Sequence, residues 1–564
     1  MTGTRPWLAH YDEGVPASID YQRLTVVEAL QRSAAEHGGE TALLFAGARL
    51  SYAELLAQVE RMASTLAGLG LGPGGRLALH LPNLPQTAVA YYAALALGAQ
   101  VVMSNPVYTD EELVPQWNDA GASIAVVADW IWADRIPRLR DRLPIRHWIV
   151  ASIPDALPAW KRWPARRALA RRTPPRVADL SAVPGTLGWR EALARGERRP
   201  LPAPPAWDSI AVLQYTGGTT GAARGAMLLH SNLACQVQQI DAWLGGLPRG
   251  RETFLAALPL FHVFGMMVCL NLPVWTSAAI VLQPDPRDTA ALLEDIGRHR
   301  VSILALVPAI FHAITHFPGV ERYDLKSIKA CLSGSAPLSV ETLQRFEELT
   351  GGRIFEGYGL TETTAATHVN PLRGLRKIGS VGVPLPDTDA RVVDPESGAP
   401  MPPGEPGELL VRGPQVMAGY WSAPEQSASA LRDGWLATGD LATCDEDGYF
   451  RIVGRKKDLI NSGGYKVFPD EVDQALARHP AVLESATIGV PDARRGETVK
   501  SFVVLRPGSA ATEKELVAHC REQLAPYKVP REIEMRASLP RSSVLKVLRR
   551  TLLAEELERR KAAP

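Results

Sequence analysis

Apolar and polar residues follow two alternating periods along most of the chain. Residues 24–36 and 52–69 carry apolar side chains at helical spacing, whereas the apolar run at 76–81 is typical of a buried strand. The apolar segment 86–97 predicts a further helix. Other strand-like runs follow at 100–103, 279–282, 301–306 and 329–332. Because helix and strand patterns keep alternating, we predict an α/β fold built in layers.

The pattern changes after about residue 379, where Gly and Pro become frequent and the apolar runs shorten. We expect a small β-barrel-like subdomain at about 379–455. The remaining chain predicts helices and strands of a compact α+β segment, at 469–478, 485–490, 501–505 and 512–524. The expected organisation is a large N-terminal α/β domain, 1–455, and a small C-terminal α+β domain, 456–564.

Composition excludes several classes of protein. A chain of 564 residues with 46% hydrophobic and 21% charged residues can form two to four globular domains. Its net charge of +1 gives no field that would recruit nucleic acid. The five cysteines lack zinc-ligand or disulfide spacing, and residues 1–20 lack the apolar core of a signal peptide. We therefore expect a cytoplasmic protein, with peripheral contact at the inner membrane face as an open alternative.

Two long segments, 77–109 and 253–284, contain no Asp, Glu, Lys or Arg. Their length alone would allow a membrane helix. Pro82 and Pro85 interrupt the first, and Pro259 and Pro273 interrupt the second. We therefore expect buried helices and strands of a large core at both places.

A basic segment at 156–178 contains seven Lys or Arg residues, no acidic residue, and the tryptophans Trp160 and Trp163. One interpretation is a patch that contacts an anionic membrane surface or an acidic partner. The other is a solvated, Arg-rich insertion. We favour the second, because runs of charge usually face solvent.

The segment 214–225 combines four glycines, three threonines and the cation Arg224 after an apolar strand-like run. Exposed backbone N–H groups and hydroxyls in such a loop suit phosphate oxygens. A Walker A loop does not fit, because its spacing is different and a second strand-like run follows at 226–229. We predict a strand–loop–strand phosphate clamp, with Ser231 as the N-cap of the next helix. A Gly/Thr-rich hairpin turn is the alternative.

This loop and five later segments resemble the adenylate-forming superfamily, whose members include acyl-CoA synthetases, luciferases and the adenylation domains of peptide synthetases. The resemblance covers nearly the whole chain and is strongest to bacterial long-chain fatty-acid–CoA ligases. The segments that carry it, besides 214–225, are Leu258–Gly265, Gly357–Thr363, Thr438–Asp440, Gly454–Asp458 and Leu539–Arg550. It implies that a fatty acid is activated with ATP and Mg²⁺ to an acyl-adenylate and then transferred to CoA.

The resemblance also assigns roles to residues of the large domain. It implies phosphate contacts from the loop, at Thr216, Gly217, Gly218, Thr219, Thr220, Gly221 and Arg224. Glu362 would coordinate Mg²⁺, and Thr361 would contact the α-phosphate. The adenine would lie between a shelf and an aromatic strand, formed by Gly334, Ser335, Ala336, Glu356, Gly357, Tyr358 and Gly359. His262 would orient the carboxylate, although a lone histidine in an apolar run is as readily a core residue.

Further roles fall near the end of the chain. Asp440 would accept the ribose hydroxyls, with Arg455 at the ribose or the phosphates. Lys546 would be the catalytic lysine, because a compact ammonium can bridge carboxylate, phosphate and ribose oxygens. Lys457 would mark the hinge on which the C-terminal domain swings between two poses. Gly463 and Gly464 would let backbone approach the CoA channel.

The sequence departs from the family pattern at two of these places. Arg224 replaces the usual lysine of the phosphate loop, and Leu545 replaces the usual glycine before Lys546. Two alternatives therefore stay open: a fatty acyl-AMP ligase that loads a carrier protein, and a non-catalytic acyl- or nucleotide-binding protein. The expected partners are fatty acid, ATP and CoA and no nucleic acid, with membrane contact and a homodimer left open.

Overall fold

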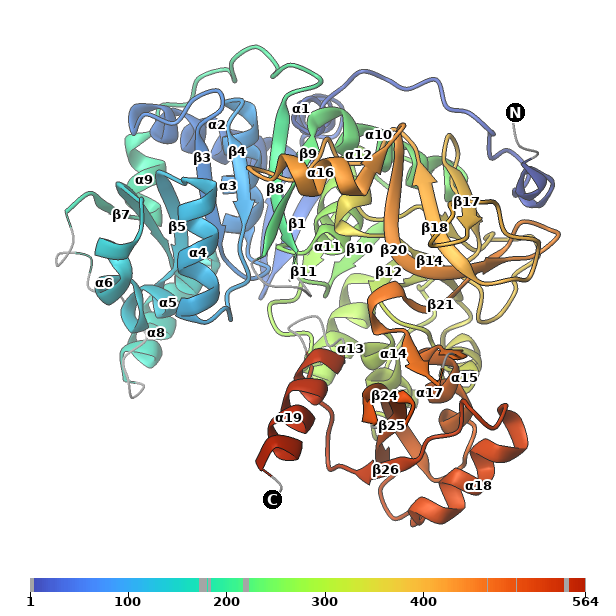
Figure 1. Ribbon diagram of the computed structural model, residues 1–564. Helices are drawn as coiled ribbons and strands as arrows, with labels where there is room; N and C mark the ends of the chain where they lie inside the picture. Colours follow the sequence, from blue (N-terminus) through green and yellow to red (C-terminus); the bar gives the residue numbers. More distant parts are fainter. Residues whose placement is uncertain are drawn as a thin grey trace. The chain divides into compact units, whose positions relative to one another are not determined.

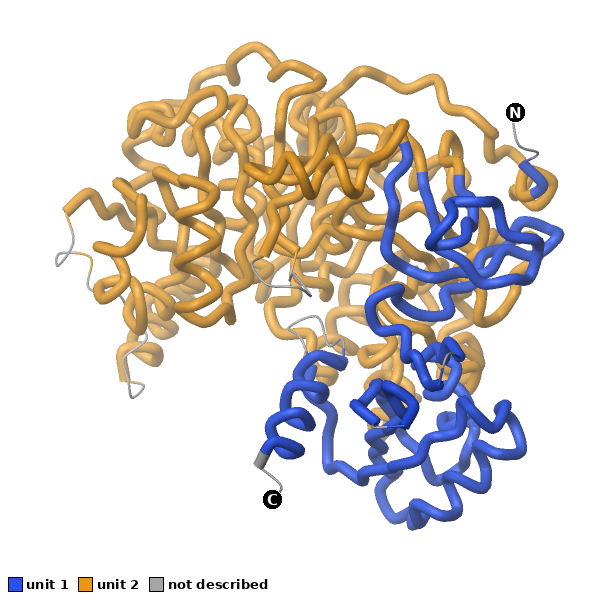
Figure 2. Tube along the Cα trace, viewed as in Figure 1, with its two compact units in different colours: residues 1–6, 390–411, 435–564 blue, residues 7–389, 412–434 orange. Residues whose placement is uncertain are grey.

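The computed structural model describes residues 5–171, 180, 184–216, 223–463, 465–492, 494–541 and 547–562 (Figure 1). By their contacts these residues form two compact units (Figure 2). The larger unit comprises residues 7–389 and 412–434, and the smaller unit comprises 1–6, 390–411 and 435–564. The mixed α/β architecture expected from the sequence is confirmed. The domain boundary expected at 455/456 stays a prediction.

A seven-stranded sheet forms the first half of the larger unit. Its strands, in spatial order, are β7 (Thr186–Gly188), β6 (His147–Ala151), β5 (Ile124–Ala128), β3 (Arg76–His80), β4 (Gln100–Met103), β8 (Ile210–Thr216) and β9 (Arg224–Leu229). All neighbours are parallel except β8 and β9. Every residue of β5 is buried, as parallel strands covered by helices on both faces require.

Helices accompany this sheet along the chain. They are α2 (Tyr52–Gly68), α3 (Pro85–Ala96), α4 (Asp110–Ala120), α5 (Asp129–Asp134), α6 (Ile136–Leu139), α7 (Ile153–Ala156), α8 (Ala159–Ala170) and α9 (Trp189–Arg195). α2 begins with a capping box, in which Ser51 and Glu54 satisfy each other's backbone N–H groups. α3 is buried along its whole length, so the charge-free stretch at 77–109 is core, as predicted.

A nine-stranded sheet forms the second half of the larger unit. Its strands, in spatial order, are β16 (Val383–Pro384), β15 (His368–Val369), β14 (Arg353–Tyr358), β13 (Ala330–Ser333), β12 (Ile303–Leu306), β10 (Thr253–Ala256), β11 (Ala279–Leu282), β1 (Thr41–Phe45) and β2 (Ala48–Ser51). The central strands from β14 to β1 run parallel. The carboxyl ends of β13 and β14 therefore lie side by side, where the adenine shelf was expected.

The other helices of this unit are α1 (Val26–Glu36), α10 (His230–Trp243), α11 (Val263–Met266), α12 (Leu272–Trp275), α13 (Thr289–His299), α14 (Pro308–Thr315), α15 (Val340–Thr350) and α16 (Pro424–Ala430). A π-helical turn, η3 (Met267–Asn271), joins α11 to α12, and the short strand β19 (Leu431–Arg432) follows α16. η3 and α12 are fully buried, so the second charge-free stretch is also core. No helix among the described residues is long and apolar enough to cross a membrane.

The smaller unit contains residues 390–411 and 435–455 of the region for which we expected a barrel-like subdomain. Strands β17 (Asp389–Val393), β18 (Gly407–Arg412) and β20 (Trp435–Cys444) lie side by side, and β21 (Phe450–Arg455) pairs with β20. Among the residues described, no strand pair closes this sheet. With β19 this is an open five-stranded sheet rather than a barrel, because its outer strands do not pair with each other in the described part of the chain.

The C-terminal part of the smaller unit is an α+β assembly, as predicted. Its elements are the turn η6 (Lys456–Asp458) with β22 (Ile460–Ser462), β23 (Tyr465–Val467), α17 (Pro469–Ala477), β24 (Val482–Asp492), β25 (Gly496–Leu505), α18 (Glu513–Gln523), β26 (Glu532–Met535) and α19 (Arg549–Ala562). Leu552 of α19 packs into an apolar cluster with Ile488 of β24 and Phe502 of β25. This cluster fixes the last helix against the sheet.

Candidate active site

Two antiparallel strands hold the Gly/Thr-rich loop at its ends. Thr216 of β8 lies opposite Arg224 of β9, and Tyr215 lies opposite Gly225. A Cβ atom on Gly225 would lie 3.1 Å from the Tyr215 ring, so glycine allows this close approach. A strand, not a helix, follows the loop, which confirms the strand–loop–strand arrangement and excludes a Walker A loop. Five residues with predicted phosphate contacts lie outside the described part of the chain: Gly217, Gly218, Thr219, Thr220 and Gly221.

The N-cap predicted for the following helix was wrong. α10 begins at His230, and Ser231 is buried in its first turn. Asn232 does the capping instead, because its Oδ1 reaches back to accept the Leu229 N–H at 2.8 Å. Its amide nitrogen donates to Pro414 O at 2.8 Å and to Val416 O at 3.0 Å. Asn232 thereby ties the helix start to the segment that leads to Tyr420.

Tyr420 fixes the carboxylate of Glu362. Glu362 lies in the short turn η5 (Thr361–Thr363), three residues after β14 ends. The Tyr420 hydroxyl donates to Glu362 Oε1 at 2.8 Å. Burial, and then the neighbouring carboxylate, raise the pKa of Tyr420 above its usual range, so the hydroxyl stays a donor. One carboxylate oxygen is thus oriented by the protein, an arrangement that suits a ligand of Mg²⁺.

Arg224 belongs to the same group of side chains. Its guanidinium lies 5.7 Å from the centre of the Tyr420 ring, within the range of a cation–π contact. A planar guanidinium stacks on an aromatic face better than an ammonium does. Arg224, which stands where the family usually has lysine, therefore has the Tyr420 ring as a contact in this structure.

Backbone hydrogen bonds join this group to the strand after the loop. Met417 N–H donates to Glu362 O at 2.8 Å, and Trp421 N–H donates to Gly225 O at 2.8 Å. The sequence analysis missed Tyr420 altogether. The Gly419-Tyr420-Trp421 triplet, two aromatic residues in a segment otherwise rich in small and polar residues, was the available signal.

The residues for which we predicted an adenine shelf lie where β13 and β14 end. Ser333 pairs with Glu356, and Gly334 and Gly357 follow them. A Cβ on Gly334 would lie 3.0 Å from the Phe264 ring, and one on Gly359 would lie 1.5 Å from Ala365 O. Position 359 therefore requires glycine, whereas a side chain at 334 would need the Phe264 ring to shift slightly. Ser335 and Ala336 are exposed, and the Ser335 backbone has a positive φ of 74°.

Other side chains of this shelf are anchored from behind. Glu356 is buried, and its Oε1 accepts the Leu338 N–H at 3.3 Å. The Tyr358 ring meets the ring of His368 edge-on at 5.9 Å. Burial lowers the pKa of His368 to about 3, so this histidine is neutral. The hydroxyl of Ser333 is buried and has no hydrogen-bond partner among the described residues.

His262 is the N-cap of α11. Its Nδ1 accepts the Phe264 N–H at 3.3 Å, and its ring is half-buried. This contact requires an unprotonated Nδ1 and fixes the orientation of the ring. His262 thus has a structural role as the N-cap of α11. Its role at the carboxylate stays a prediction.

The smaller unit brings Asp440 and Arg455 together. They are directly paired residues of β20 and β21, and Arg455 Nε lies 3.2 Å from Asp440 Oδ1. The Asp440 residue is only 5% exposed. Its own N–H donates to Thr438 Oγ1 at 3.1 Å, which fixes the turn of the Thr438-Gly439-Asp440 segment. A carboxylate fixed in this way can accept hydrogen bonds from the two neighbouring hydroxyls of a diol.

Four more predicted residues belong to this unit. Lys457 lies in η6, directly after β21, and burial and then Arg455 lower its pKa. Gly463 has a positive φ of 63°, as a tight turn requires. Gly464 and Lys546 lie outside the described residues, as does the departure at Leu545. Arg541 and Val547, on either side of 542–546, pair in an antiparallel bridge.

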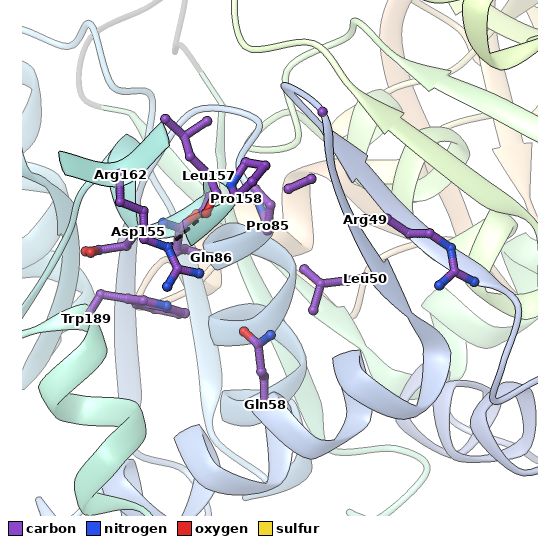
Figure 3. A pocket seen from close by; sticks show the side chains of 13 residues that line it. Arg49, Leu50, Gln58, Pro85, Gln86, Asp155, Leu157, Pro158, Arg162 and Trp189 are labelled. Atoms are coloured by element: carbon purple, nitrogen blue, oxygen red, sulfur yellow. Dashed lines mark hydrogen bonds between the residues drawn. The ribbon is translucent and has the colours of Figure 1, made fainter. Parts of the chain in front are cut away.

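A separate pocket of about 330 Å³ lies in the larger unit, away from these residues in the sequence (Figure 3). Trp189, Leu50 and Leu157 give it apolar walls, and Gln86 lines its floor. The Gln86 residue is 2% exposed, and its Oε1 has no partner among the described residues. None of the predicted site residues lines this pocket.

Comparison with protein families finds two matches that together span most of the chain. Residues 30–421 match the family described as AMP-binding enzyme, and residues 471–546 match the AMP-binding enzyme C-terminal domain. A long-chain-fatty-acid–CoA ligase of Bacillus subtilis is 41% identical over 99% of both chains. The ligase of the same name from Yersinia pestis is 38% identical over 98% of both.

Solved structures give the same result for the fold. ATP-bound MatB from Rhodopseudomonas palustris superposes with a TM-score of 0.79 at 31% identity, covering 94% of this chain and 99% of that one. An anthranilate CoA ligase in complex with anthranoyl-AMP superposes with a TM-score of 0.82 at 26% identity, covering 95% and 97%.

Proposed function

The chain belongs to the family of AMP-binding enzymes, and on this premise we propose that it is an ATP-dependent long-chain fatty-acid–CoA ligase. The observation that carries the proposal is the similarity to curated ligases of that name at 37–41% identity over at least 97% of this chain. This similarity includes every segment on which the sequence-based resemblance rested.

The proposed reaction has two steps. A carboxylate oxygen of the fatty acid bonds to the α-phosphorus of ATP, and the bond to the pyrophosphate oxygen breaks. The thiolate sulfur of CoA then bonds to the acyl carbon, and AMP leaves with its electron pair. Both steps gather anionic groups, so the protein must supply positive charge, hydrogen-bond donors and a dry pocket.

In the larger unit we assign the phosphate and metal chemistry to the Glu362 group. Glu362 would hold Mg²⁺, which neutralises phosphate charge when bound. Tyr420 keeps that carboxylate in one orientation, and Arg224 places a cation beside the same ring. Thr216 and Thr361 would add hydroxyl contacts to phosphate oxygens.

The nucleoside contacts we assign to the two anchored groups described above. A flat base would lie at the strand ends near Gly334, Gly357 and Gly359, beside the ring of Tyr358. Asp440 would accept the ribose hydroxyls, and Arg455 would hold that carboxylate in place. Lys457, Gly463 and Gly464 keep their predicted roles in the CoA step.

The acyl chain we place among the apolar elements near His262. Residues 231–240 of α10 are buried, and so are most residues of 263–275, including the π-helical turn η3. Such turns are often found at functional sites. Val307 and Phe311, at the start of α14, complete this apolar wall.

The test is to measure two half-reactions separately on the full chain. ATP–pyrophosphate exchange with a panel of fatty acids reads the first step, and thioester formation with CoA reads the second. Exchange with long-chain acids followed by acyl-CoA formation is the expected result. Exchange without acyl-CoA would favour the carrier-protein ligase, and the absence of exchange with every acid would overturn the enzyme assignment.

Two partner predictions remain proposals of their own. We propose peripheral membrane contact, for which the surface is argued below. We also propose a homodimer, which sedimentation equilibrium of the purified chain would test.

A further inference from the structure

Helix α8 is exposed to an unusual degree for its composition. None of its 12 residues is buried. The chain has 13 tryptophans, and the two that are fully exposed, Trp160 at 75% and Trp163 at 68%, both lie on this helix. In Figure 1 the helix lies at the edge of its own unit. Large aromatic side chains are seldom left in water without a binding partner.

The two sides of α8 differ. The inner side is anchored to the body of the unit: Arg162 Nε donates to Leu157 O at 2.9 Å, and Arg166 pairs with Asp155 at 2.8 Å. Arg162 and Leu157 also line the pocket of Figure 3. The helix is therefore fixed in place by residues that do not include its tryptophans.

The outer side carries what we call the Trp–Arg stripe: Trp160, Trp163, Arg167 and Arg171. Their spacing of three, four and four residues places them along one line of the helix. All four are exposed. The Arg167 guanidinium lies 5.3 Å from the Trp163 ring, so cation and aromatic ring form one surface.

We propose that the Trp–Arg stripe docks the protein onto an anionic lipid surface. Residues 159–171 contain five cations and no acid, whereas the whole chain has a net charge of only +1, so the charge is concentrated here. Tryptophan prefers the headgroup region of a bilayer, and each cation near an anionic surface adds to the attraction. An acidic protein would satisfy the arginines but would not need two exposed indole rings.

This surface is independent of the proposed chemistry, and vesicle binding tests it without any activity measurement. The full chain is mixed with vesicles of phosphatidylcholine alone, or of phosphatidylcholine with phosphatidylglycerol, and bound protein is measured by flotation. We expect binding only to the anionic vesicles, weakening as salt is added. Arg167→Glu with Arg171→Glu should weaken binding by about 30-fold or more, at roughly tenfold per 1.4 kcal/mol.

A matched control changes the same charge elsewhere. Lys514→Glu with Arg521→Glu alters two exposed cations of α18 by the same amount and should leave vesicle binding unchanged. Brominated lipid should quench part of the tryptophan fluorescence in the native chain but not in a Trp160→Ala, Trp163→Ala variant. Vesicle binding that survives both stripe variants would overturn the proposal, as would binding to polyglutamate but not to anionic vesicles.

Discussion

At the scale of single residues, the hydroxyl of Tyr420 fixes the orientation of the Glu362 carboxylate. A carboxylate beside phosphates has no reason to stay in one rotamer unless a donor holds it. Tyr420 supplies that donor at 2.8 Å, and its ring faces Arg224. The phosphate loop, the proposed metal ligand and the 417–421 segment therefore depend on one side chain.

Replacing Tyr420 by Phe should slow the first half-reaction about 10- to 100-fold, because a hydrogen bond to a charged group contributes roughly 1.5–3 kcal/mol. The ring and its contact with Arg224 would remain. ATP–pyrophosphate exchange measures the effect, with Tyr323→Phe as a control for loss of a hydroxyl elsewhere. Transfer from pre-formed acyl-adenylate to CoA should be nearly unchanged. Undiminished exchange in Tyr420→Phe would contradict the role given to Tyr420.

The sequence indicated the candidate residues, but it did not indicate the side chain that holds Glu362 in place. Glu362, Asp440 and Arg455 came from segments with recognisable order. Tyr420 did not, because it reaches Glu362 across 58 positions and nothing local signals that contact. The N-cap at Ser231 was wrong because α10 already begins at His230, and there the side chain of Asn232 accepts the Leu229 N–H.

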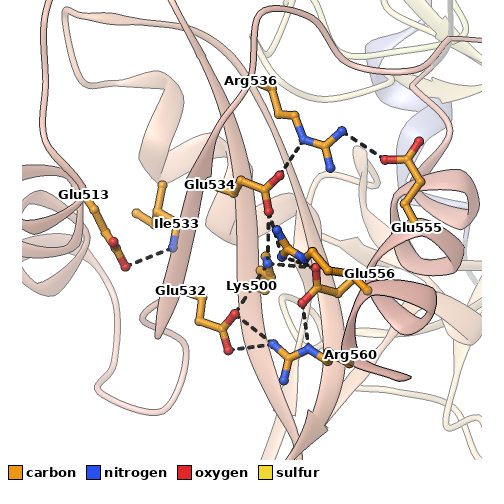
Figure 4. A network of polar contacts seen from close by, with 10 residues as sticks. Lys500, Glu513, Glu532, Ile533, Glu534, Arg536, Glu555, Glu556 and Arg560 are labelled. Atoms are coloured by element: carbon orange, nitrogen blue, oxygen red, sulfur yellow. Dashed lines mark hydrogen bonds and ion pairs between the residues drawn. The ribbon is translucent and has the colours of Figure 1, made fainter. Parts of the chain in front are cut away.

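At the scale of elements, α19 is held to its sheet by a buried cation (Figure 4). Lys500 of β25 is 3% exposed, and its Nζ lies 2.9 Å from Glu556 of α19 and 3.1 Å from Glu534 of β26. Glu556 is itself 2% exposed and also accepts from Arg560. These ion pairs connect the last helix to two strands, directly after the segment that contains Lys546.

Replacing Lys500 by Met should loosen α19, because it leaves the Glu556 carboxylate buried without its lysine. Breaking such a pair typically costs about 3 kcal/mol. Hydrogen exchange of the α19 amides should therefore accelerate by about 100-fold. Lys500→Met with Glu556→Leu should recover much of that protection, and Lys514→Met on α18 is the control. Equal protection in Lys500→Met and the native chain would contradict the anchoring role.

The same network predicts a dependence on pH. Burial alone would raise the pKa of Glu556, but Lys500 and Arg560 bring it below the ordinary value of 4.5. A carboxyl with a lowered folded-state pKa binds more protons when unfolded, so its stabilisation is complete above about pH 4.5 and is lost on acidification. We expect the protection factors of the α19 amides, which correct for the slower intrinsic exchange in acid, to fall below pH 4.5 in the native chain. The Lys500→Met, Glu556→Leu variant should show a smaller change, and an equal change in both would contradict this account.

The sequence also predicted several elements to within a few residues. α2, α3 and α17 begin and end close to their predicted bounds, because a capping residue or a proline marks where each begins. The barrel-like subdomain was not found, since the pattern of short strands does not reveal whether the outer strands of a sheet meet. Pairing between distant strands is a property of the whole sheet rather than of local spacing.

At the scale of the whole molecule, the two half-reactions of the proposed function use different chemical groups. We assign the first half-reaction to the ammonium of Lys546 and the second to the CoA thiol. The assignment of Lys546 rests on its place in the Leu539–Arg550 segment, which resembles the family's.

Replacing Lys546 by Ala should therefore abolish ATP–pyrophosphate exchange, by about 100-fold or more if one charge contact to the transition state is lost. Acyl-CoA formation from pre-formed acyl-adenylate should continue at close to the native rate. Lys514→Ala serves as the control for loss of a lysine from the same unit. Loss of both half-reactions in Lys546→Ala would contradict a role confined to the first step.

The chain passes between its two compact units four times, at 6/7, 389/390, 411/412 and 434/435. Neither unit is therefore a continuous stretch that recombination could transfer whole. A hybrid with a relative that exchanged only 435–564 would leave β17 and β18 from one parent beside β20 from the other. Exchange of the smaller unit's 390–564 part would need crossovers at 389/390 and again on both sides of 412–434. Modular reshuffling of this enzyme is constrained by the path of its chain as much as by its chemistry.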